Sequence, residues 1–370
     1  MEWASAIRPN KASPRSFHLP LPKPCSTKMA DTKQEQQLQV RLADLVEKEV
    51  RLPTIGPLKV YIQGNLDERQ NKTLFVTVHD IGANHRSFLP FINHESMEDV
   101  RERSVFFHVC LPGHHDSAPN LENCQFPTLD QIGQELIAVL NEFNLRAVVA
   151  IGEGAGANVI CRFALANPNK CLGIVLIHCT SATAGMVEYV KEKVIKRKMS
   201  TQGSVNQMAA DFLIKHKFGP FADYKSEAVQ NYALDLQQNM NAVNLALYID
   251  AFLKRTSLST ELPNLKTDAL LVVGSKVDDV HAVEKMHRLM SKEKTTLLVL
   301  DNVGNVMNEA AEKFAKALIL FCKGCGVLGA VRVPGFDRRS TLTSSSPSME
   351  EADRPRKTSL AATKFHIGTN

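Results

Sequence analysis

The residues Gly152-Glu153-Gly154-Ala155-Gly156-Ala157 follow an apolar stretch, Arg146–Ile151, and open a helical pattern, Ala155–Asn167. Glycines this close together allow a sharp turn from a strand into a helix. Two kinds of site use such a turn. One is the nucleophile elbow, G-x-S-x-G, and the other is the phosphate-binding turn of dinucleotide folds, G-x-G-x-x-G/A.

The position of the turn along the chain favours the elbow. The dinucleotide fingerprint normally follows the first strand of its domain, and the next strand should end in an acid that binds the ribose. Here about four apolar stretches precede the turn, and the next one, Leu172–Ile177, is followed by His178. The sequence therefore predicts an elbow and no nucleotide cofactor.

The elbow lacks the residues of a catalytic triad. Gly154 stands at the nucleophile position and has no side chain that could attack a substrate. Asp278, or its neighbour Asp279, could supply the acid, although acids are common in surface loops. Asn305 follows Gly304 where active hydrolases have a histidine, and an amide cannot act as a general base at neutral pH. We therefore predict a protein that is not an enzyme, with degenerate positions Gly154, Asp278 and Asn305.

Short apolar runs rich in Val, Ile, Leu and Phe alternate with helical patterns, which is typical of a mainly parallel sheet covered by helices on both faces. The predicted strands are Leu58–Gln63, Thr73–His79, Ser104–Cys110, Arg146–Ile151, Leu172–Ile177, Asp268–Val273 and Thr295–Leu300. The predicted helices are Leu129–Phe143, Ala155–Asn167, Val280–Met290 and Val306–Cys322. From about 184 to 255 only helical periodicity is seen, which predicts a helical cap broken at Gly219-Pro220. Together with the elbow, this pattern predicts an α/β-hydrolase fold.

The two ends of the chain differ from its middle in composition. Residues 1–28 carry a net charge of +4 and residues 332–370 carry +3, so the intervening residues carry −2. We predict a disordered segment at 1–33, a hydrolase-like domain at 34–331 and a disordered, Ser/Thr-rich basic tail at 332–370. The near-neutral middle excludes a basic platform for specific nucleic-acid binding and leaves peripheral membrane contact at most. Apolar residues at helical spacing in Gln34–Glu47 predict a helix on the domain's flank.

A second landmark follows the strand Thr73–His79. The residues His79-Asp80-Ile81-Gly82 stand where hydrolases place the loop that completes an oxyanion hole. We expect His79, Asp80 and Gly82 to line a pocket with Gly152, Gly154 and Gly156. Histidines around Asp116 could in principle bind a metal, but they form no metal-ligand motif, and we predict no metal site.

These segments together resemble the N-myc downstream-regulated (NDR) family over roughly residues 45–325. The resemblance is carried by His79-Asp80-Ile81-Gly82, by the glycine elbow without a nucleophile, by Gly173-Ile174-Val175-Leu176-Ile177 and by Leu271-Val272-Val273-Gly274. It implies an α/β-hydrolase fold with a helical cap and no hydrolase activity. It also implies a cytoplasmic location and roles in signal transduction, stress response and differentiation.

The tail contains candidate phosphorylation sites. Arg354 and Arg356 stand five and three residues before Ser359, a pattern that basophilic Ser/Thr kinases recognise, and Thr358 is adjacent. Ser340 and Thr341 follow two arginines and form a weaker site. A phosphate would add about two negative charges and could recruit a reader domain.

Three functions fit the sequence. The leading hypothesis is a non-catalytic scaffold or adaptor, regulated by phosphorylation, whose partners are proteins. The first alternative is a hydrolase with relocated catalytic groups such as His79, Asp80 or Cys110. The second is a binding protein for a small ligand under the cap.

Overall fold

The computed structural model describes residues 45–122, 125–183 and 204–334. Its eight strands are β1 (Val46–Leu52), β2 (Gly56–Gln63), β3 (Thr73–Val78), β4 (Ser104–Cys110), β5 (Val148–Glu153), β6 (Cys171–Ile177), β7 (Ala269–Gly274) and β8 (Thr295–Leu300). They form one sheet in the order β1-β2-β4-β3-β5-β6-β7-β8. The first two pairings are antiparallel and the remaining five are parallel. All seven predicted strands are confirmed to within two residues.

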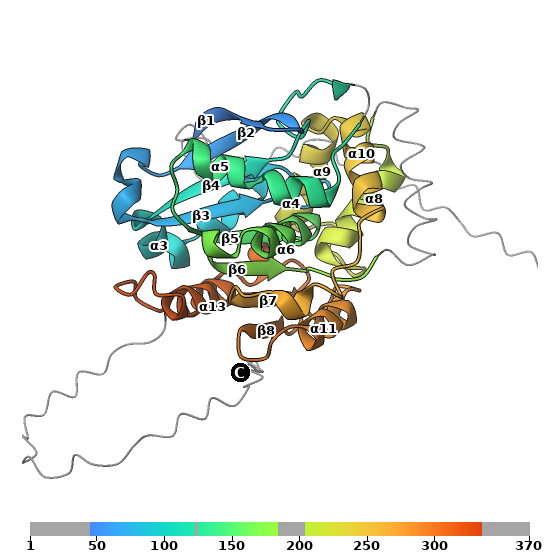
Figure 1. Cartoon of the computed structure of the whole chain (residues 1–370). Coiled ribbons are helices and arrows are strands. Elements are labelled where there is room, and N and C mark those ends of the chain that lie inside the picture. Colours follow the sequence, from blue (N-terminus) through green and yellow to red (C-terminus); the bar gives the residue numbers. More distant parts are fainter. Residues whose placement is uncertain (1–44, 123–124, 184–203, 335–370) are drawn as a thin grey trace, which may run out of the picture. The chain divides into compact units, whose positions relative to one another are not determined.

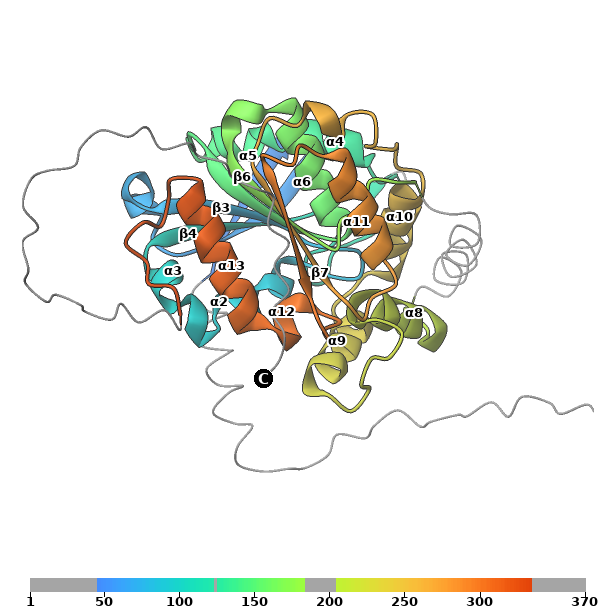
Figure 2. The ribbon, with the colours of Figure 1, turned by 90° about the horizontal axis from the view of Figure 1, so that it is seen from below.

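Helices cover both faces of the sheet, as the continuously apolar strands require. The α-helices are α2 (Leu89–Ile92), α3 (Glu98–Glu102), α4 (Leu129–Glu135), α5 (Ile137–Glu142), α6 (Ala155–Ala166), α8 (Gln207–Phe218), α9 (Glu227–Gln238), α10 (Ala242–Leu253), α11 (Val280–Leu289), α12 (Val306–Glu309) and α13 (Ala311–Gly324). Figures 1 and 2 show α4, α6 and α11 on one face and α2, α12 and α13 on the other. The predicted α/β-hydrolase architecture is confirmed.

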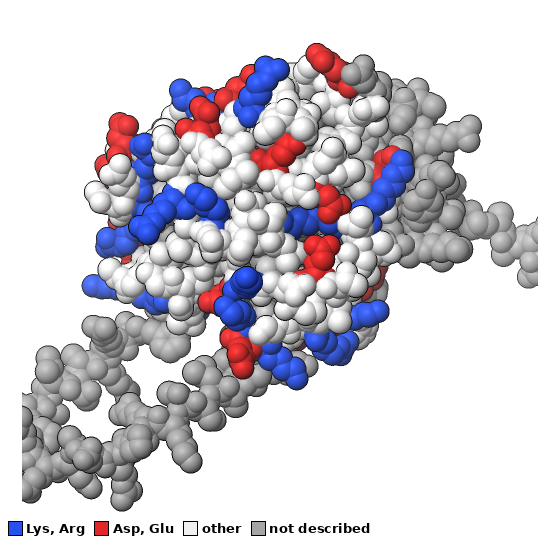
Figure 3. Space-filling model, in the orientation of Figure 1, with Lys and Arg blue, Asp and Glu red and all other residues white. Residues whose placement is uncertain are grey.

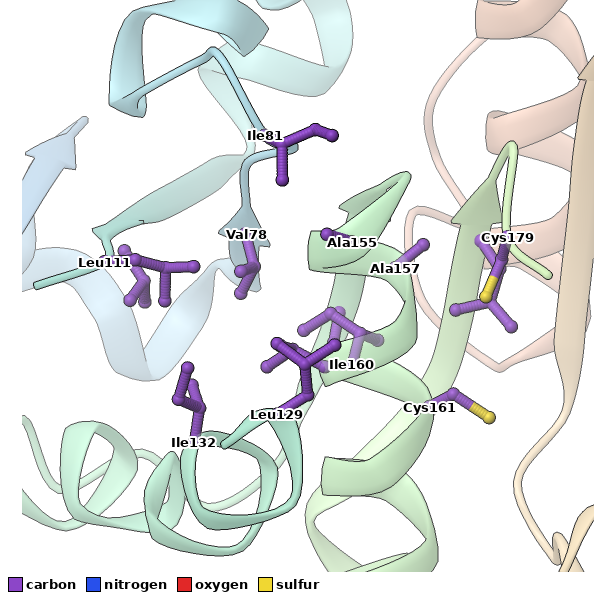
Figure 4. Close-up of a cluster of buried hydrophobic side chains, with 14 of the residues drawn as sticks. Val78, Ile81, Leu111, Leu129, Ile132, Ala155, Ala157, Ile160, Cys161 and Cys179 are labelled. Carbon is purple, nitrogen blue, oxygen red and sulfur yellow. The ribbon is translucent and has the colours of Figure 1, made fainter. Parts of the chain in front are cut away.

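Two hydrophobic clusters, one on each face, hold these layers together. The cluster under α6 joins side chains of β3, α4 and α6, and Figure 4 shows Val78, Ile81 and Leu111 on one side of Ala155 and Ile160 of α6. The cluster on the opposite face includes Phe75 and Phe106, stacked at 4.8 Å, and Phe314 of α13. This packing fixes the ends of β3 and β5, from which the candidate site is built.

Three of the sequence predictions are corrected in detail. The predicted helix Leu129–Phe143 is interrupted at Leu136, where Val139 N donates to Leu136 O, three residues earlier, in a tighter turn. The predicted helix Val306–Cys322 is interrupted at Ala310, whose backbone leaves the helical region (φ −139°, ψ 36°). Within the predicted helix Gln34–Glu47, Val46 and Glu47 belong to β1, because they pair with β2 in an antiparallel register. The earlier part of that segment lies outside the described residues.

The described part of the predicted cap consists of α8, α9 and α10, which pack beyond the carboxyl ends of the parallel strands (Figure 1). Each begins at an asparagine or serine whose side chain accepts a backbone N–H of the first turn: Asn206, Ser226 and Asn241. The predicted break at Gly219-Pro220 falls directly after α8. Residues 1–44 and 335–370, on which the two predicted disordered ends mainly fall, lie outside the described residues.

Candidate functional site

The elbow lies at the centre of the sheet. Strand β5 pairs with β3 on one side and β6 on the other, and it leads through Gly154 into α6. Gly154 has φ +54° and ψ −115°, a conformation that costs energy for residues with a side chain. Gly156 allows α6 to begin against β3, since a Cβ there would overlap the carbonyl of Val78. The glycines thus maintain the strained corner on which hydrolases carry their nucleophile.

The space above Gly154 is occupied by the carboxylate of Asp80. A Cβ atom at Gly154 would overlap all three carboxylate atoms of Asp80. Asp80 Oδ1 accepts hydrogen bonds from Ala155 N at 2.7 Å and from Ile81 N at 2.8 Å. One of these amides belongs to Ala155, the residue after the elbow position, and the other to Ile81 in the loop after β3. Amides at these two places form the oxyanion hole in hydrolases. The oxyanion hole is therefore filled by a side chain of the protein itself.

The second carboxylate oxygen of Asp80 is held by the cap. His216 Nε2 of α8 lies 2.9 Å from Asp80 Oδ2. Burial alone would raise the pKa of Asp80, but His216 and the amide of Ala155 lower it below its ordinary value. Asp80 is therefore a buried carboxylate whose two oxygens are both hydrogen-bonded.

His79 and Asn305, two other positions singled out in the sequence, have structural hydrogen bonds. His79 Nδ1 donates to Asp80 O at 2.9 Å and its Nε2 accepts from Leu111 N at 3.0 Å. Burial lowers the pKa of His79 to about 4. Asn305, which is fully buried, accepts from Asn308 N through its side-chain oxygen and so caps α12. Neither side chain is available to accept a proton from a substrate.

A buried ion pair stands next to the elbow. Lys217 Nζ of α8 donates to both carboxylate oxygens of Glu153, at 2.8 and 2.9 Å. Asn305 Nδ2 donates to Glu153 Oε1 at 3.1 Å. Both charged side chains are less than a tenth exposed. Asn305, at the histidine position of a triad, thus donates a hydrogen bond to the Glu153 carboxylate, whose charge is paired with Lys217 of the cap.

A cavity of about 80 Å³ remains over Gly154. Its described wall includes His178, Thr180, His216, Arg255 and Asp279. His178 has a left-handed backbone (φ +53°), and its buried Nε2 has no hydrogen-bond partner among the described residues. Burial lowers the pKa of His178 to about 4 and raises that of Asp279.

The structure brings together some of the expected site residues and not others. Gly152, Gly154, Gly156, His79, Asp80 and Gly82 meet at the carboxyl ends of β3 and β5. Of the two acids after β7, Asp279 faces the cavity, whereas Asp278 is exposed. Ser340, Thr341, Thr358 and Ser359 lie outside the described residues. Within the described residues, no group of three or more His, Cys, Asp or Glu side chains is arranged to hold a metal ion.

Sequence reasoning missed the contribution of α8. His216 and Lys217 lie in a run of basic residues, Lys215–Lys217, which resembles the solvated end of a helix. No local pattern connects them to Asp80 and Glu153, which are 136 and 64 residues away in the chain. The only local signal was Glu153 itself, an acid inside an otherwise apolar strand.

Comparisons with known proteins agree on family and fold. The model of the Ndr family matches residues 48–329. An uncharacterized protein of Caenorhabditis elegans is 51% identical over 86% of this chain and 95% of its own length. Protein NDRG3 of Xenopus laevis is 31% identical over 82% of each chain. An esterase of Thermogutta terrifontis has a TM-score of 0.63 and 14% identity, covering 76% of this chain and 99% of its own. At that identity the esterase shows the fold alone.

Proposed function

Since the chain belongs to the Ndr family, we propose that it works as a non-catalytic, hydrolase-like adaptor in cytoplasmic signalling. Its folded domain presents binding surfaces, and phosphorylation of its tail regulates them. The processes that we assign to it are stress response and differentiation. Within the described residues, none of the helices is both long and apolar enough to cross a bilayer.

The observation that carries this proposal is the position of Asp80. In a serine hydrolase the two amides of the oxyanion hole must be free to receive the carbonyl oxygen of the substrate. Here both amides donate to Asp80 Oδ1, and the carboxylate overlaps the space that a nucleophile side chain would occupy. To bind there, a substrate carbonyl would have to displace the buried Asp80 carboxylate, whose charge-assisted hydrogen bonds to the two amides and to His216 are stronger than ordinary neutral ones.

The Glu153–Lys217–Asn305 cluster supports the same conclusion. A general base at position 305 would have to be free to exchange protons, but Asn305 is fully buried and hydrogen-bonded to Glu153. The ion pair joins Lys217 of α8 to Glu153 at the end of β5, so the cap stabilises the elbow in the arrangement in which Asp80 occupies the oxyanion hole.

The rival enzyme with relocated groups has less support. Asp80 would be its nucleophile, yet Asp80 is not among the residues that line the cavity, and His216 covers its second oxygen. His79 would be its base, yet both ring nitrogens of His79 are hydrogen-bonded within the protein. Cys110 is fully buried, and burial raises its thiol pKa to about 12, which disfavours the reactive thiolate.

Labelling of the full chain with a serine-directed fluorophosphonate, beside an active esterase, tests the proposal. We expect no labelling and no turnover of a p-nitrophenyl ester panel above that of heat-unfolded protein. Labelling that disappears in a Thr180→Val variant, or turnover that disappears in a His79→Ala or His216→Ala variant, would show that the chain is an enzyme.

A second candidate function is the binding of a small molecule in the cavity over Gly154. The specific observation in its favour is the buried Nε2 of His178, which has no hydrogen-bond partner in the described part of the chain and lines that cavity from a strained backbone position. Native mass spectrometry of the purified chain tests this candidate. A stoichiometric adduct that is lost in a His178→Phe variant would support it, and the mass of the bare polypeptide alone would count against it.

For the phosphorylation component, incubation of the full chain with a basophilic Ser/Thr kinase should place phosphate on Ser359 or Thr358. Replacement of Arg354 and Arg356 by alanine should then abolish that modification, because these arginines carry the recognition pattern. Phosphate found only outside residues 335–370 would contradict this component.

A further inference from the structure

A groove lies at the opposite edge of the sheet from the elbow. It has a volume of about 870 Å³, and its wall is formed where β3, β4, β5 and β6 begin and where the chain continues after α13. The basic residues of this wall are Arg69, Lys72, Arg103 and Arg146, and the acidic ones are Glu68 and Glu102. In Figure 3, Lys and Arg side chains cross the left part of the molecule, beside the region where Figure 1 shows α3.

The arginines of the groove have no carboxylate partner within the described residues. Among the described residues of the wall, one ion pair is formed, and it joins Lys72 to Glu68 at 2.8 Å. Arg69 donates to the backbone carbonyls of Leu66 and Phe143, which bear no net charge. Arg103 and Arg146 are exposed, and their side chains have no hydrogen bond or ion pair with another described residue. The groove therefore has an excess of positive charge that the other described residues do not neutralise.

The groove also has an apolar component. Leu172 of β6 is 38% exposed, and Leu74, Val327 and Leu328 line the same wall. Leu172 is one of the few large apolar side chains of the sheet that are exposed, whereas all the other residues of β6 are buried. A concave surface with arginines around aliphatic side chains fits an extended segment with alternating carboxylate and aliphatic groups.

We propose that this groove is a docking site for an acidic, aliphatic peptide segment of a partner protein. Carboxylates of the peptide pair with Arg103 and Arg146, and aliphatic side chains pack on Leu172 and Val327. A single-stranded nucleic acid fits less well, since none of the described lining residues is aromatic and they offer no platform for base stacking. A bilayer fits less well because the charged residues line a concavity. The inference rests on the proposed adaptor role, for which it names a surface and a class of partner.

Fluorescence anisotropy with the full chain tests the inference. The probe is a fluorescein-labelled twelve-residue peptide of alternating glutamate and leucine, and the competitors are the same peptide with glutamine for glutamate, a polyuridine oligomer and phosphatidylserine vesicles. We expect saturable binding of the acidic peptide that weakens with salt. The double variant Arg103→Glu/Arg146→Glu should weaken it by about tenfold or more, because two charge-assisted contacts become repulsive. Leu172→Asp should weaken it as well.

The matched control is Lys285→Glu/Arg288→Glu, which makes the same charge change at exposed positions of α11. Its affinity should stay within about twofold of the wild type. If the control variant lost as much peptide affinity as the groove variant, the loss would be due to the overall charge of the protein, and the groove assignment would be overturned. Stronger competition by the oligomer or the vesicles, or no saturable binding at all, would also overturn it. Fluorophosphonate labelling reports on the absence of catalysis independently, so the failure of one idea can be told from that of the other.

Discussion

At the carboxyl-end edge of the sheet, Asp80 and Glu153 are buried, and each is bonded to a side chain of α8. At the amino-end edge, Arg103 and Arg146 are exposed and have no partner among the described residues. In a hydrolase the first edge carries the reaction and must leave polar groups free for a substrate. Here the polar groups of that edge are largely used for stability, and uncompensated charge is found at the other edge. We therefore expect partners to bind at the amino-end edge, where charged side chains have no partner among the described residues.

The largest expected effect comes from breaking the ion pair at the elbow. Lys217→Met should lower the free energy of unfolding by about 3–5 kcal/mol, because it leaves the Glu153 carboxylate buried beside an apolar side chain. Urea denaturation at pH 7 measures the effect. Adding Glu153→Gln should recover part of the loss, since the uncompensated charge is then removed.

Lys316→Met is the matched control for that prediction. Lys316 pairs with Glu312 at 2.9 Å on the surface of α13, where solvent screens the interaction, so the loss should be below about 0.5 kcal/mol. Similar losses for the two lysines would mean that the elbow pair is no more protected from water than a surface pair.

The second prediction concerns the close approach of the Asp80 carboxylate to Gly154. Gly154→Ala should cost about 3 kcal/mol, because the new Cβ meets the Asp80 carboxylate and the backbone is strained for an alanine. In an Asp80→Gly background the same substitution should cost at least about 1 kcal/mol less. Thermal or urea unfolding of the wild type, the two single variants and the double variant gives the coupling free energy between positions 80 and 154.

Gly324→Ala is the control for the glycine prediction, since a Cβ at this last residue of α13 meets nothing within 4 Å. It should leave stability unchanged or raise it by up to about 1 kcal/mol. A zero coupling between positions 80 and 154 would contradict the view that the carboxylate fills the place of the nucleophile.

The sequence was sufficient for the elbow and the sheet because both depend on local signals. Apolar runs marked seven strands, and the glycines after Arg146–Ile151 marked the turn. The first strand was missed because β1, VEKEVRL, is an edge strand whose four charged residues are all exposed, so that its pattern is hard to tell from that of a charged helix. The role of Asp80 was missed for another reason. Its partners Ala155 and His216 come from distant segments, and only the folded topology brings them to one place.

The third prediction concerns how the contribution of the Asp80 charge to stability depends on pH. The pKa of Asp80 is lowered in the folded protein, so its contribution to stability is present above the pKa of an unfolded aspartate and is lost as the pH falls through the folded value. Asp80→Asn should therefore destabilise the chain by about 1–2 kcal/mol at pH 7. The difference between the two proteins should shrink as the pH is lowered below about 4. Urea unfolding from pH 7 to pH 3 measures it, and a difference that stays constant with pH would show that the charge of Asp80 is not what the amides and His216 stabilise.

The smallest expected effect is at the amino-end edge. Arg103→Gln and Arg146→Gln should each change the free energy of unfolding by less than about 0.5 kcal/mol, because neither guanidinium has a partner to lose among the residues that the structure describes. A slight stabilisation is expected at low salt, since removing one cation reduces repulsion along the groove. Urea unfolding at 20 mM and 300 mM NaCl measures both effects. If either variant instead lost more than about 1 kcal/mol, the arginines would be part of the fold's own interactions. The groove would then resemble the elbow, where charged side chains hold the protein together.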